Sequence, residues 1–559
     1  MTLLVDRFVN RVEFDSYEDF FNNFEFVVPE NFNFGFDVVD EYAKIDPEKL
    51  ALIWCDDNEE FKFTFSDMKK LSNQAANFFK SQGIGKGDTV LLTLKNRFEF
   101  WICMVALHKI NAIAIPATHM LKPHDITYRL EKASIKMIVT IDEDNLLNDF
   151  AQCADDLGMD IKKSVVANVN REGWLNFNEE IAKMSDVYER PTGDDDNSHE
   201  DTFLIYFSSG TSGEPKMVEH AHDYALGHIT TAKYWQNVVE DGIHHTASDT
   251  GWGKAVWGNL YGQWISGTTI FIYDYVRFNG LDLIQKLVDY KVNTFCAPPT
   301  ILKFLIKEDL TQFDLSNIKY MTTAGETLPP EVFNRFKELT GLEIKEGFGQ
   351  TETTVSLATF KWLESHTGSV GKPCPAFDVS LVDADGNVVD IGDEGEIAFN
   401  ISDKRSVGLF KSYYKDEVKT KEACHDGRYH CGDQAYCDED GYFHFVGRND
   451  DVIKSSGYRI GPYEVESALI SHPSVLECAV TAYPDDTRVE IVKASIVLTK
   501  DYEPSEELTK EIQAHVKKAT APYKYPRMIV YVDELPKSTS GKIQRKVIRE
   551  NDLRALGKL

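Results

Sequence analysis

Residues 208–216 read Ser-Ser-Gly-Thr-Ser-Gly-Glu-Pro-Lys and follow the apolar run Thr202–Phe207, which has the pattern of a β-strand. Glycines allow the backbone to turn so that several N–H groups converge on one oxygen, and hydroxyls and Lys216 add donors and positive charge. A loop of Gly and Ser alone is usually a flexible connector. The Walker phosphate loop needs the pattern G-x4-G-K-[ST], which this stretch does not match because position 215 is Pro. The preceding strand and the Pro-Lys ending therefore predict a phosphate-binding loop of another kind.

The chain before this loop alternates strands with helices. Thr89–Leu94, Ala112–Pro116 and Lys136–Ile141 are short β-rich runs, and Phe98–Ile110 is a buried helix. Such alternation predicts a parallel sheet covered by helices on both faces. We therefore expect an α/β fold with a large N-terminal domain of parallel-sheet subdomains.

The pattern changes towards the C-terminus. Pro330–Leu339 is predicted to be helical and to end at Gly341. The Gly- and Asp-rich stretch 386–395 lies between strands and predicts hairpins, a small β-barrel-like part of the large domain. After Gly447 we expect a small α/β unit with helices at 463–472 and 505–518 and strands at 475–483, 492–498 and 528–532. The predicted domains are thus 1–447, a connecting segment 448–454, and 455–559.

The composition restricts the classes of binding partner and the cellular compartment that we expect for this protein. The chain has 559 residues, 42% of them hydrophobic, and a formal charge of −30, which disfavours nucleic acid and anionic membranes as partners. Nine scattered cysteines indicate a reducing compartment. The start lacks a signal peptide, and the longest apolar stretch, Phe100–Leu107, is far shorter than the ~20 residues of a membrane helix. We expect a cytoplasmic protein without an integral membrane segment.

The C-terminal end is locally basic. Residues 510–559 hold 12 Lys or Arg and 5 Asp or Glu. This excess fits an anionic ligand as well as it fits a basic surface helix. The cluster between Cys424 and Cys437 contains no C-x2-C pair, so we expect ordinary half-buried residues there and no zinc.

Several further segments carry chemistry. Gly325 and Gly347–Gly349 let a flat ring approach the backbone, and Glu352 beside Thr351 is suited to a magnesium ion between phosphates. Asp433 can accept both hydroxyls of a ribose. In isolation, each segment is better explained as an acidic turn or a surface loop. Lys542 in Pro536–Arg545 is, by itself, normally a solvated lysine.

Together, the order and wording of these motifs resemble the adenylate-forming superfamily of acyl-CoA synthetases, adenylation domains and luciferases. The resemblance runs from about Tyr42 to Arg549 and is closest to the medium-chain acyl-CoA synthetases, including the archaeal and mitochondrial types. The segments that match the family motifs almost residue for residue are Ser248–Trp252, Ser455–Pro462, Ala521–Arg527 and Gly541–Arg545. A small departure is His430, where relatives often carry an aromatic residue or a Phe-His pair.

The resemblance implies a role for each matching residue. The catalytic residues would be Lys542, Glu352 and Thr351. The ATP and AMP contacts would be Ser208, Ser209, Gly210, Thr211, Ser212, Gly213, Glu214, Pro215, Lys216, Gly325, Glu326, Glu346, Gly347, Phe348, Gly349, Gln350, Thr351, Asp433, Arg448 and Arg459. The coenzyme A contacts would be Ser456, Gly457, Tyr458, Arg488, Lys517, Tyr525, Pro526 and Arg527. The acyl pocket would be lined by His119, Trp235, Trp252, Lys254, Cys296 and Gly349. The hinge would be Asp450, and magnesium would be held by Glu352 and Thr211.

The implied activity is AMP-forming acyl-CoA synthesis. A short, medium-chain or branched fatty acid, ATP and coenzyme A would give acyl-CoA, AMP and diphosphate through an acyl-adenylate, with Mg²⁺ bound. The small C-terminal domain would be mobile and rotate between the two half-reactions. An oligomer is compatible with the sequence.

Other functions stay open at this point. One alternative is an adenylation enzyme that loads an amino or aryl acid onto a carrier protein, with Asp249 as partner for an amino group. Only 17 residues follow Lys542, so we expect no carrier domain. A luciferase-like oxygenase and a non-catalytic nucleotide sensor share the scaffold. Nothing in the sequence selects the oxygenase, and the intact Lys542, Glu352 and phosphate loop disfavour the sensor.

Overall fold

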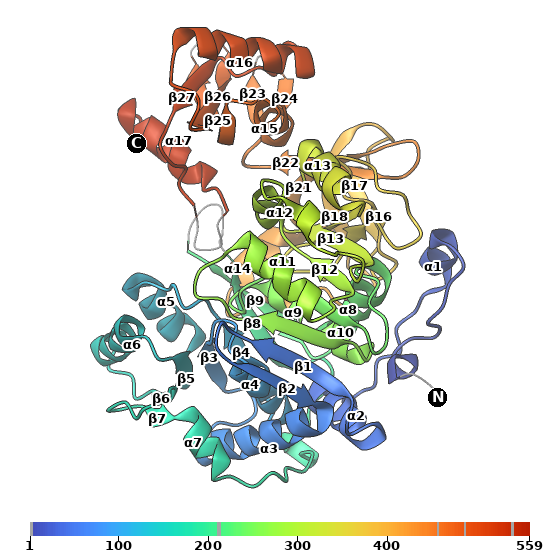
Figure 1. Ribbon diagram of the computed structural model, residues 1–559, viewed down its shortest axis with the longest axis vertical. Coiled ribbons are helices and arrows are strands. Elements are labelled where there is room, and N and C mark those ends of the chain that lie inside the picture. The colour runs from blue at the N-terminus through green and yellow to red at the C-terminus, as the bar shows by residue number, and fades with distance from the viewer. Residues whose placement is uncertain (1–3, 209–213, 456–457, 486–487, 538–541) are drawn as a thin grey trace.

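The computed structural model describes residues 4–559 except 209–213, 456–457, 486–487 and 538–541. A large unit, residues 4–447, contains three sheets, and a small unit, residues 453–559, contains a fourth (Figure 1). The predicted α/β fold is confirmed. Among the described residues, no helix has both the length and the apolar surface that a membrane crossing requires.

Two mainly parallel sheets form the centre of the large unit. The first has the order β19 (Ser412–Tyr413), β9 (Lys216–Ala221), β8 (Thr202–Ser208), β4 (Ile113–Pro116), β3 (Thr89–Thr93), β5 (Met137–Ile141), β6 (Lys162–Val166), β7 (Leu175–Asn176). The second has the order β16 (Lys372–Pro373), β15 (Leu357–Ala358), β14 (Ile344–Phe348), β13 (Tyr320–Ala324), β12 (Thr294–Cys296), β10 (Ile243–Thr246), β11 (Thr269–Tyr273), β1 (Leu50–Cys55), β2 (Glu60–Thr64). The strands from β7 to β8 and from β14 to β1 are all parallel.

The antiparallel part of the large unit follows these sheets along the chain. Its sheet has the order β17 (Val379–Val382), β18 (Glu394–Asn400), β21 (Arg428–Cys437), β20 (Cys424–His425), with β22 (Phe443–Arg448) paired to β21. The Gly-rich stretch predicted to form hairpins joins β17 to β18, which are antiparallel. The hairpin prediction is therefore confirmed.

The helices of the large unit cover the sheets. They are α1 (Tyr17–Asn23), α2 (Glu41–Ile45), α3 (Phe65–Ser81), α4 (Glu99–Lys109), α5 (Pro123–Ala133), α6 (Asp144–Asp156), α7 (Phe177–Ala182), α8 (Tyr224–Ile229), α9 (Gly253–Gly258), α10 (Tyr261–Ile265), α11 (Gly280–Asp289), α12 (Pro299–Leu305), α13 (Pro330–Thr340) and α14 (Glu417–Ala423). Helix α4 is buried along its whole length, as its unbroken apolar run predicts. Helix α13 ends at Gly341, whose φ of 72° is readily accessible only to glycine.

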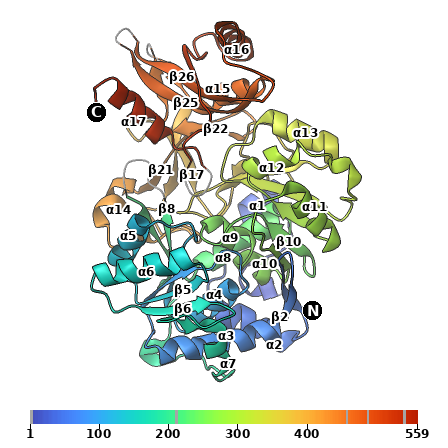
Figure 2. The same cartoon turned by 60° about the vertical axis from the view of Figure 1, so that its left-hand side comes forward.

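The small unit has a core of its own. Its sheet has the order β24 (Tyr458–Ile460), β23 (Ile453–Ser455), β26 (Val489–Leu498), β25 (Val475–Asp485), with β27 (Met528–Tyr531) beside β26. The helices are α15 (Pro462–Ile470), α16 (Glu506–Ala519) and α17 (Arg545–Ala555). Apolar residues of α15, α16 and the strands form a separate cluster. One crossing of the chain, after β22, joins the two units (Figures 1 and 2).

Candidate active site

The predicted phosphate loop connects two antiparallel strands. Ser208 at the end of β8 pairs with Lys216 at the start of β9, so the loop is closed at its base. Helix α5 contacts the end of the loop, because the Tyr128 hydroxyl donates to the Pro215 carbonyl at 3.0 Å. Glu214 lies 3.3 Å from His124. The predicted contacts Ser209, Gly210, Thr211, Ser212 and Gly213 lie outside the described residues.

A tyrosine that the sequence did not point to joins the phosphate loop to the predicted magnesium ligand. The Lys216 ammonium lies 3.3 Å from the Tyr413 hydroxyl, and this hydroxyl donates to Glu352 Oε1 at 2.9 Å. Glu352 is buried, with 8% of its surface exposed. Burial and the Glu352 charge raise the pKa of Tyr413, so the phenol stays protonated and donates. Lys216 and Glu352 are thereby held at one place.

Glu352 suits a magnesium ion. Mg²⁺ is commonly held by one or two carboxylates, with substrate phosphates and waters completing the shell. The described residues contain no group of three His, Cys, Asp or Glu side chains that could hold a metal. A single buried carboxylate beside a phosphate loop therefore fits a magnesium ion that arrives with the nucleotide.

A second network surrounds Asp433. Gln350 Nε2 donates to Asp433 and to the Cys431 carbonyl, and the Tyr429 hydroxyl donates to Gln350 Oε1 at 2.6 Å. Asp433 on β21 pairs across the sheet with Arg448 on β22. Burial raises the pKa of the Asp433 carboxyl to about 6, against the lowering effects of Arg448, Gln350 and Lys542. The carboxylate is therefore ionised at neutral pH and can accept hydroxyl groups.

The neighbouring strands β13 and β14 end in the predicted adenine segments. Gly325 has a φ of 97°, and among the described residues no atom lies within 4 Å of a Cβ built on it, which leaves open space over this backbone. The Glu326 carboxylate accepts the Thr300 hydroxyl at 2.8 Å. Glu346 is buried, accepts the Leu328 N–H at 2.7 Å, and has a pKa raised by burial to about 8. A flat, largely apolar ring fits beside such groups.

Two tryptophan rings lie close to the glycines of the segment 347–349. A Cβ on Gly347 would lie 2.5 Å from the Trp235 ring, and one on Gly349 would lie 2.4 Å from the Trp257 ring. Trp257, on α9, is a residue that sequence reasoning missed; the sequence pointed to Trp252, immediately before this helix. Phe348 between the glycines lies near Phe445, with ring centroids 6.2 Å apart.

The remaining acyl candidates lie at the strand ends of the two parallel sheets. Lys254 donates to the Ala324 carbonyl at 2.7 Å, and burial lowers the pKa of its ammonium. The Cys296 side chain, at the end of β12, partly opposes this lowering of the Lys254 pKa. His119 Nδ1 lies 3.6 Å from Asp249, which raises the pKa of His119. These contacts join Lys254 to the end of β13 and His119 to Asp249.

Lys542 belongs to the small unit but acts on the large one. Its side chain is exposed. Its positive charge lowers the pKa of Asp433 on β21 and of Lys254 on α9. Thr351, the other predicted catalytic residue next to Glu352, is fixed through its carbonyl, which His220 contacts at 2.9 Å.

The predicted coenzyme A contacts cluster on the small unit. Lys517 lies over the Tyr525 ring at 3.9 Å, and Arg527 donates to the Tyr525 hydroxyl at 2.9 Å. Pro526 lies between them in sequence and accepts Gln513 Nε2 through its carbonyl. Tyr458 is half exposed and stacks on Tyr523 at 4.1 Å.

The other predicted small-unit residues lie at the hairpin tip and the chain crossing. The Arg488 N–H donates to the Asp485 carboxylate at 2.8 Å. The predicted hinge residue Asp450 lies 3.4 Å from Arg448. Ser456 and Gly457 lie outside the described residues, and Arg459 is described by its backbone alone.

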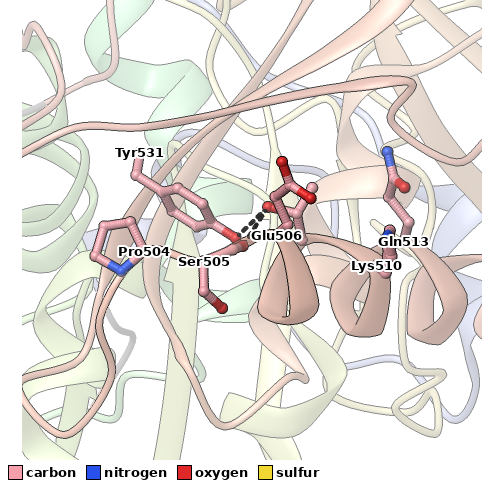
Figure 3. A pocket seen from close by; sticks show the side chains of 7 residues that line it. Pro504, Ser505, Glu506, Lys510, Gln513 and Tyr531 are labelled. Carbon is pink, nitrogen blue, oxygen red and sulfur yellow. Dashed lines mark hydrogen bonds between the residues drawn. The ribbon is translucent and has the colours of Figure 1, made fainter.

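A separate open pocket lies on the outer side of the small unit. It is lined by Pro504, Ser505, Glu506, Thr509, Lys510, Gln513 and Tyr531, and Thr509 is hydrogen-bonded to Tyr531 at 2.9 Å (Figure 3). Helix α16, which forms one wall, faces away from the large unit (Figure 1). This pocket is not part of the site described above.

Comparison with known protein families gives two matches. Residues 39–414 match the AMP-binding enzyme family, and residues 464–542 match the AMP-binding enzyme C-terminal domain. The first match ends with the strand that carries Tyr413, and the second ends at Lys542. Together they cover most of the chain.

Among curated proteins and solved structures, the similar chains are acyl-CoA-forming enzymes. The mitochondrial acyl-coenzyme A synthetase ACSM3 of Mus musculus is 39% identical over 549 residues, covering 96% of this chain and 94% of the relative. The human mitochondrial ACSM5 is 40% identical, covering 94% and 91%. The structure of the anthranilate CoA ligase AuaEII with anthranoyl-AMP aligns with a TM-score of 0.86 at 29% identity, covering 95% of this chain and 99% of that one.

Proposed function

Because this chain belongs to the AMP-binding enzyme family, we propose that its large and small units together form one adenylating site with Lys542 at their boundary. The chain is an AMP-forming acyl-CoA synthetase: it joins a carboxylic acid to coenzyme A and converts ATP to AMP and diphosphate. The alternative, loading of an amino or aryl acid onto a carrier protein, is not favoured by these relatives.

The observation that carries the site proposal is a contact between the two units: the Tyr463 hydroxyl on α15 donates to the Leu328 carbonyl of the large unit at 2.9 Å. Lys542 of the same small unit helps to lower the pKa of Asp433 and of Lys254, which flank the proposed ribose and acyl positions. A lysine there can contact the carboxylate of the acid and the α-phosphate of ATP at once. Attack of one anion on another needs such cancellation of charge and a fixed geometry.

The first half-reaction forms the acyl-adenylate. A carboxylate oxygen attacks the α-phosphorus, a P–O bond forms, and diphosphate leaves with the electrons of the broken P–O bond. We assign Lys216 and the 208–216 loop to the departing phosphates, and Lys542 to the reacting oxygens. Glu352 and Thr211 would hold Mg²⁺, which supplies charge neutralisation between phosphates when bound; Thr211 is assigned by its place in the motif alone.

We assign the nucleoside to groups that lie between the phosphate loop and Lys542. Asp433, ionised at neutral pH, accepts the ribose hydroxyls, and Arg448 lies beside it. The adenine ring lies on the open backbone at Gly325 and against the 346–349 segment. Arg459 is assigned to the nucleotide by its place in the motif alone.

The second half-reaction transfers the acyl group. The thiol sulfur of coenzyme A attacks the acyl carbon, the C–O bond to phosphate breaks, and AMP leaves. We propose that Lys517, Tyr525 and Arg527, with the 456–458 segment, Arg488 and Pro526, bind the coenzyme A nucleotide after the small unit rotates about Asp450. The domain limits 1–447, 448–454 and 455–559 belong to this proposal.

The acyl group is proposed to be short, medium-chain or branched. Trp235 and Trp257 lie against Gly347 and Gly349, so bulky rings occupy the space that a long straight chain would need. We assign His119, Lys254 and Cys296 to the same pocket, where Lys254 lies on the helix that also carries Trp257. The pocket then accepts small and branched acids better than long ones.

A substrate screen tests the function and the specificity together. Coenzyme A-dependent release of AMP is measured with C2–C12 straight acids, branched acids and aromatic acids. We expect the highest kcat/KM for short, medium-chain or branched acids. Diphosphate exchange that depends on amino acids and not on fatty acids would favour the carrier-protein alternative.

The cellular location is proposed from the cysteines. All nine lie in the described ranges and are free, which fits a reducing compartment. The cytoplasm is the location that the sequence predicts, and the relatives ACSM3 and ACSM5 are mitochondrial. Fractionation of cells that express the full chain distinguishes the two.

A further inference from the structure

Two buried carboxylates of the small unit meet two arginines of α17. Arg545 donates to Glu466 with both Nε and Nη2, at 3.1 and 2.8 Å to Oε1 and 2.7 Å to Oε2. Its Nη1 lies 3.8 Å from Asp451, to which Arg549 also donates. Glu466 and Asp451 are 8% and 9% exposed. These four residues form what we term the hinge clamp.

The hinge clamp has a defined geometry. A guanidinium that binds a carboxylate with two nitrogens fixes both distance and orientation, which a lysine cannot do. Glu466 Oε1 also accepts the Val480 N–H at 2.8 Å, so the carboxylate is anchored to β25 as well as α15. A buried carboxylate needs such partners because an unpaired charge there is strongly unfavourable. The clamp thus joins α15, β25 and α17 rigidly.

One end of the clamp lies next to Lys542. Arg545 is the first residue of α17 and follows Lys542 by three positions. The N–H of Gln544, between them, donates to the Pro536 carbonyl at 2.8 Å. The Lys542 backbone is therefore attached to a short segment that is fixed at its base by Arg545.

The other end of the clamp lies at the chain crossing. Asp451 follows the predicted hinge residue Asp450 directly. The N–H groups of Asp451 and Val452 both donate to the Arg448 carbonyl at 3.0 Å, which forms a tight turn. Any rotation that starts at Asp450 moves Asp451, and with it the two arginines.

We propose that Arg545 is a positioning residue for adenylate formation: through Glu466 and Asp451 it makes the Lys542 segment a rigid extension of the hinge. The proposal rests on the role given to Lys542 above. When the two-nitrogen contact is weakened but both side chains stay, the small unit keeps its separate apolar core and can still rotate, but Lys542 is no longer delivered at a fixed position. Adenylation then loses rate, while thioester formation, which does not use Lys542, is retained.

The test compares the two half-reactions in the full chain. Arg545→Lys keeps the charge and removes the two-nitrogen contact, and Glu466→Gln keeps the shape and removes the charge. Adenylation is followed as diphosphate release without coenzyme A, and thioester formation is followed from supplied acyl-AMP and coenzyme A. We expect either change to lower kcat for adenylation about tenfold or more, with KM for ATP and the thioester rate changed less than about threefold.

A matched control and a double variant complete the experiment. Arg554→Lys alters an arginine of the same helix that has an exposed ion pair with Glu550, and should leave both rates unchanged. Arg545→Lys with Glu466→Gln should lose no more than the worse single change, because both remove one interaction. Equal loss in both half-reactions, loss confined to thioester formation, or no loss would overturn the proposal. A wild-type chain without acid-dependent AMP release would instead refute the proposed function.

Discussion

Replacing Glu346 by glutamine isolates one buried carboxyl group whose titration should shape the stability of the protein. Glu346 is 6% exposed, and among the described residues its carboxyl group accepts a hydrogen bond from the Leu328 N–H alone, at 2.7 Å. Burial raises its pKa from 4.5 to about 8. In the folded protein the group therefore keeps its proton at neutral pH, whereas in the unfolded chain it is ionised.

The sign and size of the effect follow from this difference. Between pH 4.5 and 8 the folded state binds more protons than the unfolded state, so the free energy of unfolding falls as the pH rises. The fall is about 1.4 kcal/mol for each pH unit inside this window. Between pH 5.5 and pH 7.5 the titration of Glu346 should thus lower the free energy of unfolding of the wild type by roughly 3 kcal/mol. Glutamine does not titrate, and its amide oxygen can still accept the Leu328 N–H. The free energy of unfolding of the variant therefore lacks this fall with pH.

The assay is urea unfolding at pH 5.5, 6.5 and 7.5, followed by tryptophan fluorescence. The difference between variant and wild type removes the contribution of other titrating groups, which both proteins share. We expect Glu346→Gln to become relatively more stable at each higher pH. Glu338→Gln, an exposed glutamate of α13 paired with Arg335, is the matched control and should follow the wild type. Parallel pH profiles for Glu346→Gln and wild type would refute the reasoning.

Four further changes test the proposed site. Lys542→Ala should abolish adenylate formation, measured as diphosphate release, and leave thioester formation from supplied acyl-AMP largely intact; equal loss in both would contradict this. Asp450→Pro, which fixes φ, should keep the first half-reaction and block the second, and normal overall turnover would rule out this hinge. Gly349→Ala should push the Trp257 ring, 2.4 Å from the new Cβ, into the acyl space, lowering kcat/KM for the longer acids about tenfold more than for acetate; an unchanged chain-length profile would argue against it. For the wild type, KM for ATP should rise as the pH falls below about 6, where Asp433 takes up a proton. Asp433→Asn should raise this KM roughly tenfold or more and remove its pH dependence, and a variant with the wild-type pH profile would exclude Asp433 as the titrating group.

Most of the fold could be predicted because its signals are local. The predicted strands at 89–94 and 136–141 match β3 and β5 to within one residue at each end. Gly341 ends α13 as expected, since its positive φ is a property of that residue alone. The strand 202–207, which corresponds to β8, was recognisable for the same reason.

The parts of the site that could not be predicted depend on contacts between distant segments. Tyr413 follows Lys216 by 197 residues, and it reaches Lys216 and Glu352 only because β19 pairs with β9. The Trp257 ring on α9 lies against Gly349, which is distant from it in the sequence, and the sequence offered Trp252 with equal reason. Glu346 was predicted to lie in a nucleotide-binding segment, and its protonation could not be predicted because it depends on burial by residues from several elements.

The single crossing of the chain between the two units has a kinetic consequence. Two separate polypeptides would form the site by collision, and its occupancy would fall with dilution. A short tether instead presents Lys542 to the large unit at an effective concentration on the order of millimolar or higher, whatever the amount of enzyme. The encounter of Lys542 with the large unit is therefore intramolecular, and dilution of the enzyme should not lower the specific activity by separating the two.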